Sequence, residues 1–163
     1  MASLIVLHTC ESDGTAEANA EYLVRMGYEP HWVYDPRFPP DEAIQLLPYT
    51  RAGKALRNLA GGVETNQRER DNQAGTDVIQ VEVVGYAADS PTQDDQWYRN
   101  LKAFLEQLCA DTGVPYRFPR RFAGSYGDDV RYSPAEWDDP ALAGIIGHCH
   151  VPEQDHWDPG ALD

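Results

Sequence analysis

The C-terminal tail of the sequence concentrates side chains that can bind a metal ion. Five such residues lie within one short stretch: His148, His150, Asp155, His156 and Asp158. Imidazole nitrogens and carboxylate oxygens suit zinc, which takes four tetrahedral ligands and leaves one position to water in catalytic sites. A ligand from a distant segment would complete such a site. The residue types are therefore consistent with the chemistry of a metal-dependent hydrolase.

Two earlier histidines could supply that distant ligand. His8 ends an apolar run from Ser3 that predicts a buried strand, and His31 begins a second short strand. A single histidine at a strand end is more often structural than a metal ligand. Ligand chemistry alone therefore leaves seven candidates open, namely these two histidines and the five residues of the tail.

The elements that must position these residues alternate between strands and helices. Strands are predicted at residues 3–8, 31–34, 43–47 and 78–84, and helices at residues 15–26 and 96–109. Gly27 stands where the first helix should end, and the capping-box sequence Ser133-Pro134-Ala135-Glu136 begins a further short helix. This order predicts a single α/β domain, with a central mixed β-sheet flanked by helices.

Composition limits the classes of partner. The chain has 163 residues, 13 basic and 27 acidic, and its formal charge of −14 argues against nucleic acid and anionic membranes. No apolar run approaches the roughly 20 residues that span a bilayer, and no signal peptide is visible at the N-terminus. The three cysteines give no complete disulfide framework, so we expect them to be reduced.

Several short motifs, in this order and spacing, carry a resemblance that covers nearly the whole chain. They are Val6-Leu7-His8-Thr9, Pro30-His31-Trp32-Val33, Ile44-Gln45-Leu46-Leu47-Pro48, Gly61-Gly62-Val63-Glu64-Thr65-Asn66, the strand from Val78 to Gly85, Gly147-His148, and His156-Trp157-Asp158-Pro159-Gly160. The sequence resembles the zinc N-acetylmuramoyl-L-alanine amidases of the peptidoglycan-recognition-protein fold. It is especially similar to the amidase domains of endolysins from phages of actinobacteria.

The resemblance implies a role for five residues. His8, His148 and Asp158 would bind one zinc ion per chain, and Asp158 follows His148 by ten residues, as the third ligand does in the family. Glu82 matches the catalytic glutamate of the central strand, and His156 stands where many members carry a catalytic lysine. Glu82 would move the proton of the attacking water, and His156 would hydrogen-bond the developing oxyanion.

The sequence departs from the family at two positions. Histidine at position 156 is mostly uncharged near neutrality whereas lysine is charged, so oxyanion stabilisation would depend on pH. Pro30 replaces a tyrosine that some relatives use, which leaves Glu82 as the obvious base. His31, His150, Cys149 and Asp155 receive no catalytic role.

The resemblance also implies a setting for the enzyme. Residues 1–163 would form one catalytic domain, excised from a longer endolysin with a C-terminal wall-binding module. The enzyme would be made in the host cytoplasm, act on cell-wall peptidoglycan after release, and be a monomer. The polar segment from Arg57 to Asp77 would contact peptide stem or glycan, or else be a solvated loop. The alternatives are a non-catalytic peptidoglycan-binding module, which the presence of Asp158 disfavours, and a zinc amidase of small muropeptides.

Overall fold

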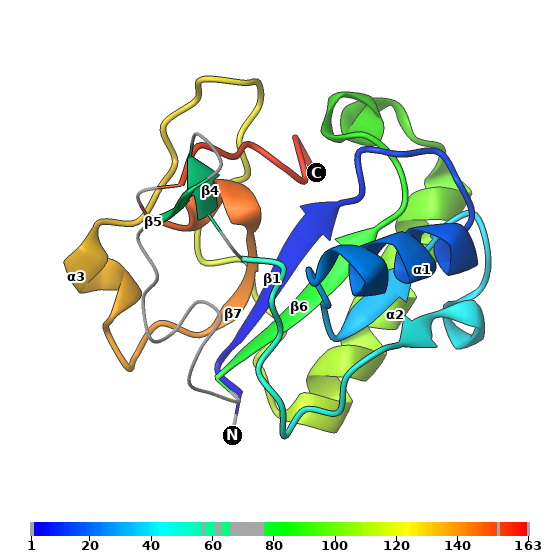
Figure 1. Cartoon of the computed structure of the whole chain (residues 1–163), viewed down its shortest axis with the longest axis horizontal. Helices are drawn as coiled ribbons and strands as arrows, with labels where there is room; N and C mark the ends of the chain where they lie inside the picture. Colours follow the sequence, from blue (N-terminus) through cyan, green and yellow to red (C-terminus); the bar gives the residue numbers. More distant parts are fainter. Residues whose placement is uncertain (1, 57, 61–62, 66–76, 153, 163) are drawn as a thin grey trace.

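The computed structural model describes residues 2–56, 58–60, 63–65, 77–152 and 154–162. Its centre is a five-stranded sheet in the order β3-β2-β6-β1-β7 (Figure 1). The strands are β1 (Leu4–Thr9), β2 (Trp32–Tyr34), β3 (Ile44–Gln45), β6 (Val78–Val83) and β7 (Gly144–Gly147). All neighbours are parallel except β3, which pairs antiparallel with β2 at one edge. The predicted α/β domain with a mixed sheet is confirmed.

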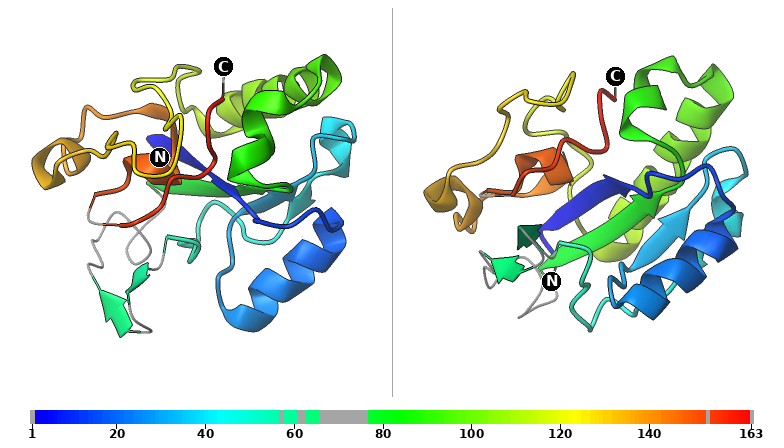
Figure 2. Two further views of the ribbon diagram at one scale, coloured as in Figure 1. Left: turned by 90° about the horizontal axis from the view of Figure 1, so that it is seen from above. Right: turned by 45° about the horizontal axis from the view of Figure 1, so that its top comes forward.

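Two helices cover opposite faces of this sheet. Seen from above, the sheet lies between α1 (Ala16–Met26) and α2 (Asp95–Thr112) (Figure 2). Shorter elements connect the rest: the helix α3 (Pro134–Trp137) and the 3-10 helices η1 (Pro40–Glu42), η3 (Ala87–Thr92) and η4 (His148–His150). No helix among the described residues is long and apolar enough to cross a membrane.

The face under α2 is the larger part of the hydrophobic core. Alternate residues of β1 and β6 point towards it, and α2 contributes one apolar stripe. The cluster includes Ile5, Leu7, Ile79, Val81 and Val83 from these strands, and Trp97, Leu101, Phe104, Leu105 and Leu108 from α2. Full burial of one such side chain contributes about 1.5–3 kcal/mol. Packing on this face therefore fixes which residues of the two strands point the other way.

The opposite face is apolar at its ends and polar in between. One cluster joins Leu4 and Val6 to Trp137 of α3, and another joins Val33 and Val84 to α1. The polar residues of the two central strands on this face are His8, Gln80 and Glu82, all of them buried. Three buried polar side chains on one sheet face need partners, which identifies this region as the place to look for a site.

Both long helices begin and end at residues that the sequence marks. The Thr15 hydroxyl caps α1, and Gly27 ends it with a left-handed φ of 76°. The Asp94 carboxylate caps α2, which continues past the predicted end at residue 109 because a left-handed residue first occurs at Gly113. The predicted capping box between Ser133 and Glu136 is present at α3.

All four predicted strands differ from the observed ones by at least one residue, and the first and third differ most. The first includes Thr9, so His8 lies within β1 and not at its end. The strand predicted at residues 43–47 is reduced to Ile44–Gln45, because the N–H groups of Leu46 and Leu47 both turn to the carbonyl of His31. In the polar segment, the structure describes the pair β4 (Asn58–Ala60) and β5 (Val63–Thr65), and the last residue, Asp77. Most of the segment predicted to contact substrate, and the glycines at 61 and 62, lie outside the described residues.

Candidate metal centre

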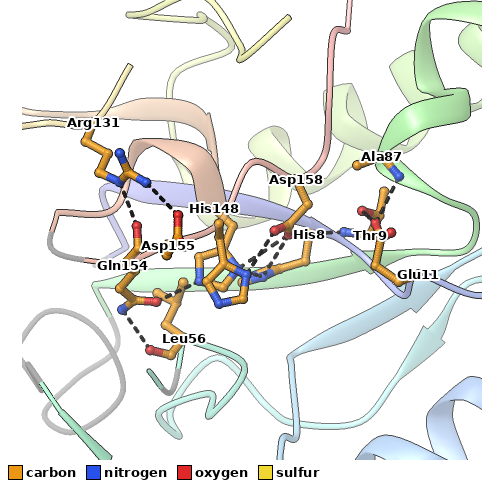
Figure 3. A network of polar contacts seen from close by, with 11 residues as sticks. His8, Thr9, Glu11, Leu56, Ala87, Arg131, His148, Gln154, Asp155 and Asp158 are labelled. Atoms are coloured by element: carbon orange, nitrogen blue, oxygen red, sulfur yellow. Dashed lines mark hydrogen bonds and ion pairs between the residues drawn. The ribbon is translucent and has the colours of Figure 1, made fainter. Parts of the chain in front are cut away.

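The three predicted ligands come together at the carboxyl ends of neighbouring parallel strands. His8 lies near the end of β1, His148 directly follows β7, and Asp158 belongs to the C-terminal tail that crosses above them (Figure 3). All three are buried, and one ligand atom from each lies within 4.8 Å of the others. The other four of the seven open candidates are not members of this group.

The spacing of the three ligand atoms suits a zinc ion. The Nδ1 atoms of His8 and His148 are 3.0 Å apart, and Asp158 Oδ2 lies 3.7 Å from the first and 3.4 Å from the second. Tetrahedral zinc with bonds of about 2.0–2.1 Å separates its ligand atoms by about 3.3 Å. Two imidazoles and one carboxylate also match the donor set of hydrolytic zinc sites. The residues present therefore fit a zinc ion.

The tautomer of His148 is fixed by a neighbouring amide. Gln154 donates its side-chain N–H to the carbonyl of Leu56 at 3.0 Å, which turns its Oε1 towards His148. That oxygen lies 2.7 Å from His148 Nε2, and because an amide oxygen only accepts, Nε2 must carry the proton. In the neutral form of His148 the other nitrogen, Nδ1, is then unprotonated, and this atom lies on the side of His8 and Asp158, where it can bind a metal ion.

His8 is held in its neutral form. Burial lowers the pKa of His8 well below its ordinary value, and the neighbouring His148 lowers it further. Its Nε2 atom is buried and has no hydrogen-bond partner among the residues that the structure describes. A neutral imidazole is the form that binds a metal ion, so the environment of His8 favours a ligand.

Asp158 carries a negative charge at the centre of the group. Burial acts to raise its pKa, but the attraction and hydrogen bonding of His148, together with His156 and His8, outweigh burial and lower it. The backbone N–H of Thr9 also donates to Asp158 Oδ2 at 3.4 Å. The carboxylate is therefore ionised and directed at the two imidazoles.

His156 contacts two of the three ligands. Its ring stacks on that of His148 with centroids 3.7 Å apart, and its Nδ1 lies 3.3 Å from Asp158 Oδ1. Its side chain is 41% exposed, whereas those of His8 and His148 are almost fully buried. His156 therefore lies where the site opens to solvent, a position that suits both support of Asp158 and contact with a bound substrate.

Glu82 lies beside His8 on the next strand. The two residues are register partners in the parallel pair of β1 and β6, so their side chains point to the same face. Glu82 is 7% exposed, and burial raises the pKa of its carboxyl well above the ordinary value, with the charge of Asp158 adding to the effect. The Cys10 thiol donates a hydrogen bond to the Glu82 carboxyl, which by itself lowers this pKa. A buried carboxyl with a raised pKa next to a metal site can act as a proton shuttle.

The remaining candidates have structural partners. His31 Nδ1 accepts from the backbone N–H of Gln80 at 3.0 Å, and its Nε2 donates to the carbonyl of Arg51. His150 likewise accepts from Gly147 and donates to Arg121, and burial lowers its pKa to about 4. Asp155 is exposed and pairs with Arg131 at 3.3 Å. None of the three points its polar atoms to the ligand group.

Three further residues of the site were not predicted. Gln154 contacts His148, and Gln80 accepts from the backbone N–H of Ala55 and so fixes the segment before Leu56. Glu11, which has a positive φ of 49°, accepts from the hydroxyl of Thr9 and from the N–H of Ala87 at the start of η3. Only Gln80 left a signal in the sequence, as a polar residue on a valine-rich strand.

The comparisons agree with this fold. The chain is similar to a solved structure described as a selenomethionine derivative of AmpD, with a TM-score of 0.52 and 19% sequence identity over 99% of this chain and 80% of that one. AmpD is an N-acetylmuramoyl-L-alanine amidase. At this identity the likeness establishes the fold. No protein-family model matches the sequence, and no curated protein is significantly similar to it.

Proposed function

We propose that the chain is a zinc-dependent N-acetylmuramoyl-L-alanine amidase. It would hydrolyse the amide bond between the lactyl group of N-acetylmuramic acid and the L-alanine of the peptide stem in bacterial peptidoglycan. The observation that carries the proposal is the convergence of His8, His148 and Asp158 next to a buried Glu82. The support from the comparisons is that this site lies on a fold shared with AmpD, itself such an amidase.

The chemistry divides between the metal and two residues of the chain. Zinc held by His8, His148 and Asp158 would supply Lewis-acid activation of the scissile carbonyl and of the attacking water. Glu82, whose raised pKa favours proton uptake, takes the proton of that water and returns it to the departing L-alanine nitrogen. His156, at the exposed side of the site, hydrogen-bonds the oxygen on which negative charge develops.

We further propose the setting that the resemblance implies. The enzyme acts as the lytic domain of a phage endolysin on the bacterial cell wall and works as a monomer. The formal charge of −14 would not attract the domain to an acidic wall, so shape and hydrogen bonding must supply its affinity.

The test combines metal content with product release. Zinc per chain and free L-alanine N-termini released from purified peptidoglycan are measured for the wild type, Asp158→Ala and Glu82→Gln. We expect one zinc and activity in the wild type, loss of both in Asp158→Ala, and zinc without activity in Glu82→Gln. Glu82→Gln is the matched control, because it keeps the size of the side chain and removes only its ability to exchange a proton.

Two results would change the assignment. A wild type that binds peptidoglycan, but neither binds zinc nor cleaves the amide bond of the substrate, would make the domain a recognition module. A wild type that cleaves soluble muropeptides and leaves polymeric peptidoglycan intact would make it an enzyme of wall turnover and contradict the lytic role.

A further inference from the structure

We propose that Gln154 is a positioning residue, which holds His148 in the tautomer and orientation that zinc binding requires. This inference rests on the proposed zinc site and adds to it a residue outside the ligand set. Gln154 is 2% exposed, and its side chain lies between His148 and Leu56 (Figure 3). It is one of the few buried side-chain amides among the residues that the structure describes, and both ends of the amide are used.

The contacts of the amide define its orientation. The N–H group of Gln154 donates to the Leu56 carbonyl at 3.0 Å, and its oxygen accepts from His148 Nε2 at 2.7 Å. Exchanging the nitrogen and oxygen would place two acceptors together at Leu56, so only one orientation satisfies both contacts. In that orientation Nε2 of His148 is protonated, and Nδ1, which faces His8 and Asp158, is the nitrogen that would bind the metal.

The surroundings of Gln154 hold it in this place. Its backbone carbonyl accepts from Arg131 Nε at 2.6 Å, and Arg131 also pairs with the neighbouring Asp155. On the other side, Leu56 is fully buried, and Gln80 of the central strand binds the N–H of the adjacent Ala55 at 2.7 Å. The orientation of His148 is thus determined by segments on both sides of the amide.

Glutamine suits this position better than similar side chains. Leucine has about the same size but offers no acceptor to His148, so the proton of the neutral imidazole could lie on either nitrogen. Glutamate would still accept from His148 Nε2 but would face the Leu56 carbonyl with an oxygen. Loss of such a partner of a ligating histidine typically weakens metal binding by about 10–100-fold.

The experiment measures zinc affinity and the His148 tautomer, neither of which depends on amidase activity. Zinc Kd is determined by competition with a chromophoric chelator, and the ring nitrogens of His148 are observed by 15N NMR in the metal-free protein. We expect Gln154→Leu to raise the Kd by about 10–100-fold and to lose the preference for a protonated Nε2. Gln154→Glu should keep the Nε2 proton and lose less affinity.

Tyr34→Phe is the matched control. It also removes one hydrogen bond of a buried side chain, the 2.9 Å bond from the Tyr34 hydroxyl to the Phe38 carbonyl, at a residue outside the ligand group. It should lower the Tm without changing the zinc Kd. If Gln154→Leu binds zinc as tightly as the wild type does and keeps the same His148 tautomer, the positioning role proposed for Gln154 is wrong, while the proposed zinc site is unaffected. A wild type that binds no zinc overturns the proposed function, and this inference with it.

Discussion

Glu82 is a buried acidic residue beside the ligands. In the metal-free protein, burial and the charge of Asp158 raise the pKa of the Glu82 carboxyl well above its ordinary value. The unfolded chain has a carboxyl pKa of about 4.3, so between the two values the folded state holds more protons than the unfolded state. The free energy of unfolding therefore falls as pH rises through this window.

Glu82→Gln should remove this dependence. We expect the metal-free variant to have a higher Tm than the wild type at pH 7–8, and a flatter Tm profile from about pH 4.5 upward. The same variant should keep its zinc and lose at least about 100-fold in amidase rate, the usual contribution of a general base. Calorimetry in the presence of a chelator across this pH range checks the predicted Tm difference. Parallel Tm profiles for the two proteins would contradict it.

His156 presents a choice between two roles that one substitution separates. Its ring stacks on that of His148 and forms a hydrogen bond with Asp158, yet its side chain is more exposed than those of the three ligands. If it stabilises the oxyanion, His156→Ala should lower kcat by about 10²–10³-fold with zinc affinity little changed. Zinc titration beside steady-state rates makes the comparison. A loss of zinc affinity as large as the loss of rate would instead assign His156 to the support of Asp158.

At the scale of elements, the tail that carries Asp158 is held by η3 and η4. The Ser90 hydroxyl of η3 donates to the Pro159 carbonyl at 2.6 Å, and the Cys149 N–H of η4 donates to the Asp158 carbonyl. Gly160 has a left-handed φ of 79°, and an added Cβ would overlap the carbonyl group of Ala87. The close approach of the tail to η3 thus requires glycine at this position.

Gly160→Ala should loosen the tail and weaken the metal site. Gly27→Ala is its control, since Gly27 has a φ of 76° but open space around the position of a Cβ. We expect Gly27→Ala to cost about 1–2 kcal/mol, the cost of a left-handed alanine, without affecting zinc. Gly160→Ala should cost clearly more and raise the zinc Kd. Equal losses of stability in denaturant melts would show that contact with Ala87 adds nothing.

Much of the element order could be predicted from local patterns, because caps and periodicity are local. Thr15, Gly27 and the box at Ser133 set helix ends within a few residues. The strand predicted at residues 43–47 is longer than the observed Ile44–Gln45, since apolar composition does not reveal that the next two N–H groups turn to the His31 carbonyl. Gln154 left no signal, because its bond to Leu56 spans 98 residues and one glutamine makes no pattern.

The ligand set shows the same limit at the site. Residue chemistry left seven candidates, and the choice of His8, His148 and Asp158 came from the resemblance. The structure brings these three together because parallel pairing of β1 with β7 aligns the ends of both strands. The roles of Glu82 and His156 stay predictions, although their positions beside the ligands agree with them.

At the scale of the whole molecule, the three ligands come from segments that meet only when the chain is folded. His8 lies near the N-terminus, while His148 and Asp158 lie near the other end. An ion that binds this group therefore binds the folded state and not the unfolded chain. Metal binding and folding are coupled, and the stability of the protein reports directly on the site.

Zinc should accordingly raise the Tm of the metal-free protein. A ligand at 100–1,000 times its Kd stabilises by about 2.7–4.1 kcal/mol, which corresponds to about 5–15 °C for a domain of this size. Asp158→Asn keeps the side-chain volume but removes the charge, so its Tm should respond little to zinc, and chelator should return only the wild type to its metal-free value. Magnesium serves as the control ion, because a site of two imidazoles and one carboxylate suits it poorly. A Tm that is indifferent to zinc in the wild type would mean that the pocket between His8 and Asp158 holds no metal, and that the buried histidines are held there by hydrogen bonds alone.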